Sequence, residues 1–138
     1  MRFPIALLAA VLFIHAPVDA ARQTAGGVTV IAAKRAKAYS SPTRQIKARN
    51  EMEDVVIVLR VGGKSRDDFQ KVDRDKIYVM AGDEKLSPNV VASGVVDGKD
   101  EVLIVVVGPK AMLDMTLFFG DYPRVAFTAE ENISDELH

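Results

Sequence analysis

Short apolar runs separated by turn residues dominate the chain from residue 28 onward. Gly, Pro, Asn, Asp and Lys interrupt these runs, and no longer window shows a helical period. Runs of this length that are rich in β-branched residues are typical of strands. Strands are expected over residues 28–36, 55–61, 76–80, 90–96, 102–107, 113–119 and 125–128. The sequence therefore predicts an all-β fold, an immunoglobulin-like antiparallel β-sandwich of about seven strands.

The clearest local signal is a hairpin around Asp97-Gly98. β-branched runs flank this dipeptide, and Asp-Gly supplies the positive φ that a tight turn needs. Further turns are expected at Gly108-Pro109, because proline cannot continue a central ladder, and at residues 120–123. Alternate residues of the run between these two turns share one face and are expected in the core: Leu113, Met115, Leu117 and Phe119.

The first twenty residues read as a secretory signal peptide. A basic start at Arg2 leads into an apolar run, and small residues stand at positions 18 and 20, ahead of the predicted cleavage site. A retained membrane anchor needs about 20 apolar residues. Polar residues and a proline interrupt this run earlier, at His15, Pro17 and Asp19. We therefore expect a periplasmic or secreted protein with no integral membrane span after cleavage.

The predicted organisation is a single domain between two short ends. Residues 1–20 are the signal peptide and residues 21–27 a flexible mature N-terminus. Residues 28–128 form the β-sandwich domain, which is long enough to bury a core without further support. Residues 129–138 are expected to be a polar acidic tail that carries no structure.

Charge and composition exclude several kinds of partner and site. The formal net charge of −1 argues against nucleic acid or an anionic membrane surface as the main partner. The chain has no cysteine, so it can form no disulfide, use no thiolate and build no cysteine metal site. A basic cluster at residues 34–49 favours a solvated face, with a polyanion site as the alternative.

No residue pattern indicates catalysis. The two histidines are His15, inside the predicted signal peptide, and His138, the last residue, so a Ser-His-Asp triad or a histidine zinc site is not expected. Acidic loops at residues 67–75 and 97–101 offer oxygen ligands for Ca²⁺, but the spacing does not match a calcium loop. We expect no enzyme, no cofactor and no metal site, and calcium binding by the acidic loops stays open.

Two predicted strands carry apolar residues on both faces. Residues 55–59 and 102–107 do not alternate, so the outer face of their sheet must be covered by a long loop such as residues 62–75, by a neighbouring protomer or by a partner. The candidate residues of a binding face are Val56, Val58 and Tyr78. A shift of one residue in register would reverse the facing of all three.

The pattern of residues 69–80, 86–88, 102–109 and 115–120 resembles the telokin-like, immunoglobulin-fold domains secreted by many bacteria. The resemblance covers about residues 28–128, although the chain lacks the two cysteines and the tryptophan of antibody-type domains. It implies a non-catalytic extracytoplasmic module and assigns no site residue.

These observations favour an exported, non-catalytic β-sandwich module that binds an unidentified protein partner, or a second copy weakly, in the cell envelope or outside the cell. Binding is expected at an exposed strand edge or at an apolar sheet face. One alternative is a small envelope enzyme or enzyme inhibitor in which Asp73, Asp75 and Asp97 converge. Another is a small-ligand carrier with a cavity lined by Met115, Leu117 and Phe127.

Overall fold

The computed structural model describes residues 26–138, and these form an all-β sandwich. The predicted signal peptide and the start of the predicted flexible N-terminus lie outside the described residues. The strands are β1 (Thr29–Ala36), β2 (Ala38–Ser40), β3 (Gln45–Lys47), β4 (Asp54–Gly62), β5 (Ile77–Ala81), β6 (Glu84–Leu86), β7 (Val90–Val96), β8 (Lys99–Pro109), β9 (Asp114–Phe119), β10 (Val125–Thr128) and β11 (Ile133–Ser134). Two short helices, α3 (Arg66–Gln70) and the 3₁₀ helix η2 (Arg74–Lys76), lie between β4 and β5.

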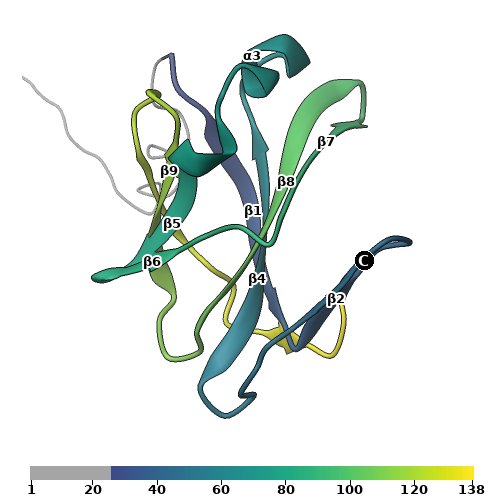
Figure 1. Ribbon diagram of the computed structural model, residues 1–138, viewed down its shortest axis with the longest axis vertical. Helices are drawn as coiled ribbons and strands as arrows, with labels where there is room; N and C mark the ends of the chain where they lie inside the picture. Colours follow the sequence, from purple (N-terminus) through teal and green to yellow (C-terminus); the bar gives the residue numbers. More distant parts are fainter. Residues whose placement is uncertain (1–25) are drawn as a thin grey trace, which may run out of the picture.

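Two sheets form the two layers of the sandwich (Figure 1). The five-stranded sheet has the order β11-β1-β4-β8-β7, and the four-stranded sheet has the order β10-β9-β5-β6. The order β1-β4-β8-β7 against β10-β9-β5 is that of an immunoglobulin constant-type domain, to which β6 adds one strand. All pairs within the two sheets are antiparallel except β1 with β11. The predicted immunoglobulin-like antiparallel sandwich is confirmed.

All the predicted strands are present, as β1, β4, β5, β7, β8, β9 and β10. The predicted turn between β7 and β8 is also confirmed, because Asp97 and Gly98 have φ values of 52° and 77°. Two details differ. The described chain has four additional short strands, β2, β3, β6 and β11, and β8 continues through the expected turn at Gly108 to end at Pro109.

The main core lies between the two sheets. On β4 the residues at odd positions from Val55 to Val61 point inward, and Ile104 and Val106 do the same on β8. The facing sheet contributes Met115, Leu117 and Phe119, as predicted, whereas Leu113 is half-buried. Fully burying one such side chain contributes about 1.5–3 kcal/mol. This core therefore holds the two layers together without disulfides.

The loop at residues 62–75 packs a side chain into the main core and does not contribute to the apolar cluster on the outer face. Ser65 caps α3 by accepting a hydrogen bond from the Asp68 amide at 3.2 Å. This helix places Phe69 inside the sandwich, where its ring meets Phe119 edge to face at 5.7 Å between centroids. The expectation that this loop covers the outer face of the five-stranded sheet is therefore wrong.

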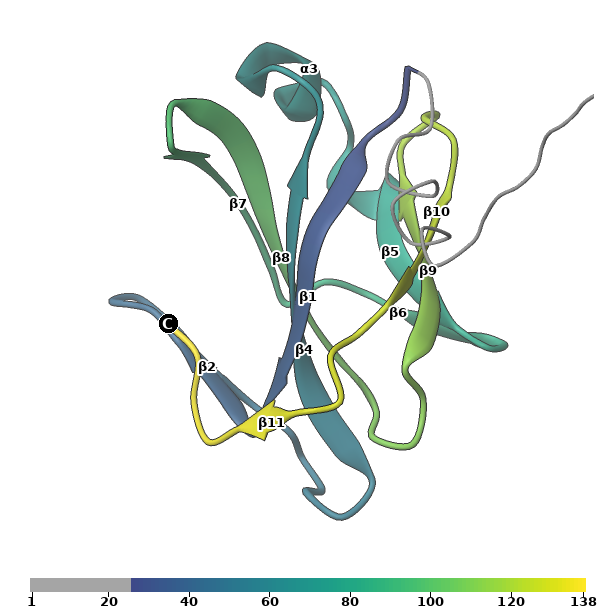
Figure 2. The same cartoon turned by 180° about the vertical axis from the view of Figure 1, so that it is seen from behind.

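A second apolar cluster covers part of that outer face. It contains Tyr39, Ile46, Val56, Val58 and Val105, and we call it the outer-face cluster. The β2–β3 hairpin crosses the sheet on the side away from the four-stranded sheet and contributes the first two residues (Figure 2). The covering element is thus the insertion between β1 and β4, because this hairpin presents buried residues from both of its strands.

The C-terminal segment, residues 129–138, is folded onto the sandwich. β11 pairs in parallel with the end of β1, and the Ser134 carbonyl accepts a hydrogen bond from the Lys37 amide at 2.8 Å. Leu137 then exchanges backbone hydrogen bonds with β2, donating to Ala38 at 3.0 Å and accepting from Ser40 at 2.9 Å. The expectation that residues 129–138 carry no structure is therefore wrong. Backbone hydrogen bonds hold this segment in place, although its side chains are mostly polar.

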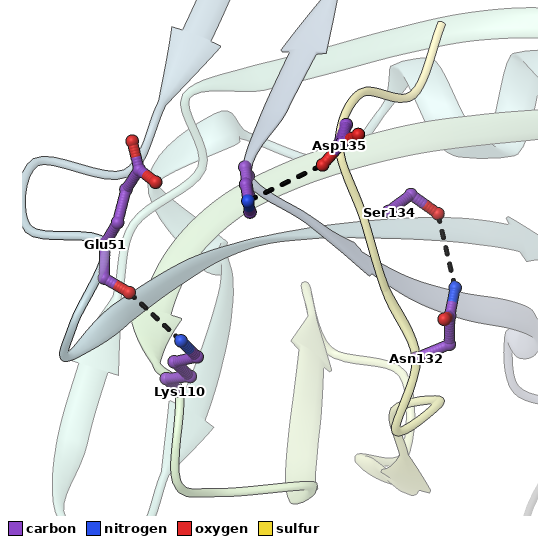
Figure 3. A network of polar contacts seen from close by, with 6 residues as sticks. Glu51, Lys110, Asn132, Ser134 and Asp135 are labelled. Atoms are coloured by element: carbon purple, nitrogen blue, oxygen red, sulfur yellow. Dashed lines mark hydrogen bonds and ion pairs between the residues drawn. The ribbon is translucent and has the colours of Figure 1, made fainter.

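Side chains add to this attachment. Figure 3 shows Asp135 in an ion pair, which joins its carboxylate to Lys37 Nζ at 3.5 Å, and Asn132 donating to Ser134 Oγ at 3.4 Å. Both contacts are exposed, so each contributes little to stability.

Arg35 fixes the start of the C-terminal segment from inside the protein. Its side chain is buried, and its guanidinium donates to the carbonyl oxygens of Lys110, Glu130 and Glu131 at 2.7, 2.8 and 2.6 Å. Hydrogen bonds from a charged donor are stronger than neutral ones. One buried arginine therefore joins β1, the turn after β8 and the C-terminal segment.

Candidate functional site

The predicted binding-face residues do not form one surface. Val56 and Val58 face outward from the five-stranded sheet, but their exposed fractions are 0% and 9% because the β2–β3 hairpin covers them. Tyr78 lies on β5 in the other sheet. The prediction that these valines form an exposed binding face is wrong, because sequence patterning gave their facing but not the hairpin above them.

Tyr78 is half-buried, and side chains of this chain contact its ring. Its ring stacks on Phe118 with 4.8 Å between centroids and 10° between planes. Lys85 Nζ lies 4.5 Å from the centroid of the Tyr78 ring. Stacking and cation–π contacts of this kind stabilise a surface locally. These contacts explain the position of the Tyr78 ring without a ligand.

The three aspartates of the enzyme alternative do not converge. Asp73 precedes η2 and Asp75 lies within it, both exposed, while Asp97 is exposed in the turn between β7 and β8. Within residues 26–138 no group of three His, Asp or Glu side chains is arranged to hold a metal ion.

The three residues of the carrier alternative, Met115, Leu117 and Phe127, are buried in the main core. Their side chains pack with the rest of that core. Phe127 also lines a recess of about 150 Å³ beside β1, but neither Met115 nor Leu117 contributes to it, so the three residues do not line one common cavity there.

β7 is the longest of the four described strands that end the two sheets. β11 has two residues, β6 has three, of which two are charged, and β10 has four. β7 has seven residues and no charge, and every residue from Ala92 to Val96 is exposed. The exposed fractions of Val95 and Val96 are 65% and 39%. Proteins usually protect a sheet edge with charges, proline or short length, and β7 has none of these.

Recesses flank the middle of β7. The outer recess, of about 250 Å³, is lined by Arg60, Ala92, Ser93, Gly94, Val96, Glu101, Val102 and Leu103. A smaller recess of about 100 Å³ is lined by Arg66, Ser93, Gly94 and Val95. A Cβ added at Gly94 would meet no atom within 4 Å. Small residues in the middle of β7 therefore leave room for incoming side chains.

An ion pair lines the outer recess. Arg60 Nε and Nη2 each donate to Glu101 at 2.8 Å, a bidentate geometry, and the Glu101 side chain is buried. The hydrogen bonds to Glu101 raise the pKa of the Arg60 guanidinium above its ordinary value. The Arg60 guanidinium therefore keeps its charge and gives the recess a fixed polar side beside Leu103.

The two ends of β7 carry opposite charge. Arg44 Nη1 donates to the Asn89 carbonyl at 2.7 Å, and Arg74 Nη2 donates to the Pro88 carbonyl at 3.1 Å, just before the strand begins. Asp97 follows the last residue of the strand and is exposed. The edge therefore has two arginines at its start and one aspartate directly after its end, with Lys99 paired to Val96 on the neighbouring strand.

Comparison with protein-family models, curated proteins and solved structures found no match to this chain. The class is thus defined by the strand order alone: an immunoglobulin-like β-sandwich in which β7 is the longest terminal strand among residues 26–138. Among residues 26–138 there is no helix with the length and apolar character needed to cross a membrane.

The sequence predicts β7 as a strand but does not indicate that it lies at a sheet edge. Strand order decides which strand lies at an edge, and strand order depends on long-range pairing. One signal was present in the sequence: the run Val-Val-Ala-Ser-Gly-Val-Val has no charge and small central residues. A strand of this composition is exposed to pairing wherever it lies at an edge.

Proposed function

We propose that this protein is an exported, non-catalytic binding module that takes an extended segment of a partner protein at the free edge of β7. The observation that carries the proposal is the contrast between this long uncharged edge and the covered outer-face cluster. In strand addition, backbone hydrogen bonds supply affinity and pockets for alternate side chains supply specificity. β7 offers both, with unpaired backbone along the strand and recesses beside Ser93 and Gly94.

Other observations support a binding role rather than catalysis. The acidic residues of the enzyme alternative stand on two different exposed turns. The ionisable pair nearest β7, Arg60 with Glu101, is already mutually satisfied, and a bidentate pair of this kind is typical of a structural role. The pattern of the first twenty residues supports export to the periplasm or beyond.

Site-specific photo-crosslinking in the source cell tests this proposal. A photoreactive phenylalanine analogue replaces Val95 in the full chain, and the same analogue replaces Met52 as the control, because Met52 is 84% exposed and precedes β4. We expect a discrete crosslinked protein from position 95 and none from position 52. Equal crosslinking from both positions, or crosslinking from position 52 alone, would contradict the proposal.

Hydrogen exchange of the isolated complex supplies a second readout. The outward amides of residues 90–96 should exchange slowly when the partner is bound and fast when it is absent, because strand addition gives them hydrogen-bond partners. Unchanged exchange along β7 in a complex would place binding elsewhere.

Export has a separate test. Mass spectrometry of the protein recovered from the cell envelope or the medium should give Ala21 as the first residue. Recovery of the chain from the cytoplasm with Met1 to Ala20 still attached would contradict export while leaving the proposed binding edge in place.

A further inference from the structure

We infer that the segment which β7 takes is β7 of a second copy of this chain, paired antiparallel about a two-fold axis at Ser93. This inference rests on the proposed strand addition and names its partner. The two five-stranded sheets would then continue into one sheet across the dimer. Two features of β7 support this pairing: its residue order and the charges at its two ends.

The sequence of β7 is nearly symmetric about its middle. Centring the pair on Ser93 sets Val90 opposite Val96, Val91 opposite Val95 and Ala92 opposite Gly94 of the second copy. This register is the one that pairs all seven residues. Every directly opposed pair is either apolar or Ser93 with Ser93, so no charges of like sign meet. A two-fold contact requires such a self-complementary surface.

Charges at the ends of β7 complement each other in the same register. The position opposite Asn89 is then Asp97 of the second copy. Arg44 already lies at the Asn89 carbonyl, and Arg74 lies at the neighbouring Pro88 carbonyl. An acidic side chain would therefore arrive beside two guanidinium groups, and the two-fold axis repeats this contact at the other end. A parallel or shifted pairing would separate these charges.

The small residues at the centre fit this arrangement. Gly94 has open space at its Cβ position, and both recesses include Ser93 and Gly94 in their lining. Side chains of the second copy that lie diagonally across from Ser93 and Gly94 therefore find space on either face of the joined sheet. One pair of seven-residue strands buries a small interface, and interfaces of that size belong to weak, reversible dimers.

Cysteine crosslinking tests the register directly, because the chain has no cysteine of its own. Ser93→Cys puts two thiols on the two-fold axis, where directly opposed Cα atoms lie about 4.5–5.5 Å apart, within reach of a disulfide. Val95→Cys is the matched control on the same strand. Its two thiols would be offset by four residues, about 13 Å, which is too far for a disulfide. We expect mild oxidation of the dilute protein to give a disulfide dimer from Ser93→Cys and monomer from Val95→Cys.

Sedimentation of the processed chain, residues 21–138, which contains both sheets, tests the edge itself. Val95→Lys places two ammonium groups in the paired strands and should raise the dimer dissociation constant about tenfold or more. Met52→Lys makes the same change at an exposed site away from β7 and should leave the constant unchanged.

A double-mutant cycle tests the charge contact. Asp97→Asn keeps a residue that tolerates the positive φ at this turn, and it should weaken the unmodified dimer. In an Arg44→Glu background, which keeps only Arg74 as a cationic partner, the same change should weaken the dimer less or strengthen it. Equal weakening in both backgrounds would overturn the antiparallel register.

The outcomes separate this inference from the proposed function. A monomer at all concentrations, or a dimer that Val95→Lys does not weaken, would overturn the second copy as the partner. If position 95 then still crosslinks to a different protein in the cell, strand addition at β7 stands with another partner. If position 95 crosslinks to nothing, both the inference and the proposed function fail.

Discussion

The outer face of the five-stranded sheet has a covered half and an open half, and the two halves differ in composition. Val56 and Val58 lie under the β2–β3 hairpin in the covered half. Arg60, on the same strand and the same face, lines the recess beside β7 in the open half. The chain therefore covers its most apolar outer surface with its own hairpin. The surface that stays accessible lies beside β7, where small residues and the Arg60–Glu101 ion pair line a recess.

One kind of substitution, valine to lysine, should have its largest effect in the covered half and a small effect at the exposed edge of β7. Val56→Lys buries an unpaired ammonium beneath the hairpin and should lower the free energy of unfolding by about 3–5 kcal/mol. Val95→Lys adds the same group at an exposed edge and should change it by about 0.5 kcal/mol or less. Urea unfolding followed by circular dichroism measures both. Equal losses would mean that the hairpin does not seal the covered half.

Arg35 gives the next largest effect, because it holds the start of the C-terminal segment that continues into the covered half. Arg35→Met keeps much of the aliphatic packing but removes three hydrogen bonds to carbonyl oxygens. We expect a loss of about 2–3 kcal/mol, since these carbonyls lose a charged donor. Lys34→Met, at the exposed neighbouring position, is the control and should be nearly neutral. A neutral Arg35→Met would show that the segment is held by backbone pairing alone.

Arg35 also shows what the sequence could not reveal. It belongs to a basic cluster whose composition favours a solvated face, and its neighbours Lys34 and Lys37 are indeed exposed. Arg35 points into the sandwich because its position in β1 sets it opposite Ile57, an inward-facing residue of β4. Its partners are carbonyls far along the chain, which carry no side-chain signature. Composition therefore could not distinguish a buried clamp from a surface cation.

The long strands were predictable for the opposite reason. β4, β8 and β9 are β-branched or alternating runs bounded by turn residues, so their side chains encode both the strand and its inward face. β2, β3 and β11 have two or three residues, too few to show a period. They are held by backbone hydrogen bonds and by long-range contacts with the sheet. The edge position of β7 was equally hidden, because it follows from sheet order.

Leu137 tests whether the C-terminal segment helps to seal the covered half. Its half-buried side chain packs against the outer-face cluster. Leu137→Ser should lower the free energy of unfolding by about 1 kcal/mol, a fraction of the value for full burial. His138→Ser is the matched control at the exposed next position. A larger loss from the control would mean that the contact between the His138 imidazole and the Glu136 carboxylate, rather than apolar contact, attaches the segment.

The smallest expected effect is a pH dependence of the same attachment. The Ser40 hydroxyl donates to the Glu136 carboxylate, and this hydrogen bond holds the pKa of the carboxyl below its ordinary range. A lowered folded pKa contributes stability above the unfolded value of about 4.3, and this contribution is lost as the pH falls through the folded pKa. Wild type should therefore be slightly more stable than Glu136→Gln at pH 7, and this difference should be smaller at an acidic pH below the unfolded value. Glu131→Gln removes the same charge elsewhere in the segment. If thermal unfolding at both pH values shows the same difference for Glu131→Gln, overall charge rather than the Ser40 contact controls the attachment.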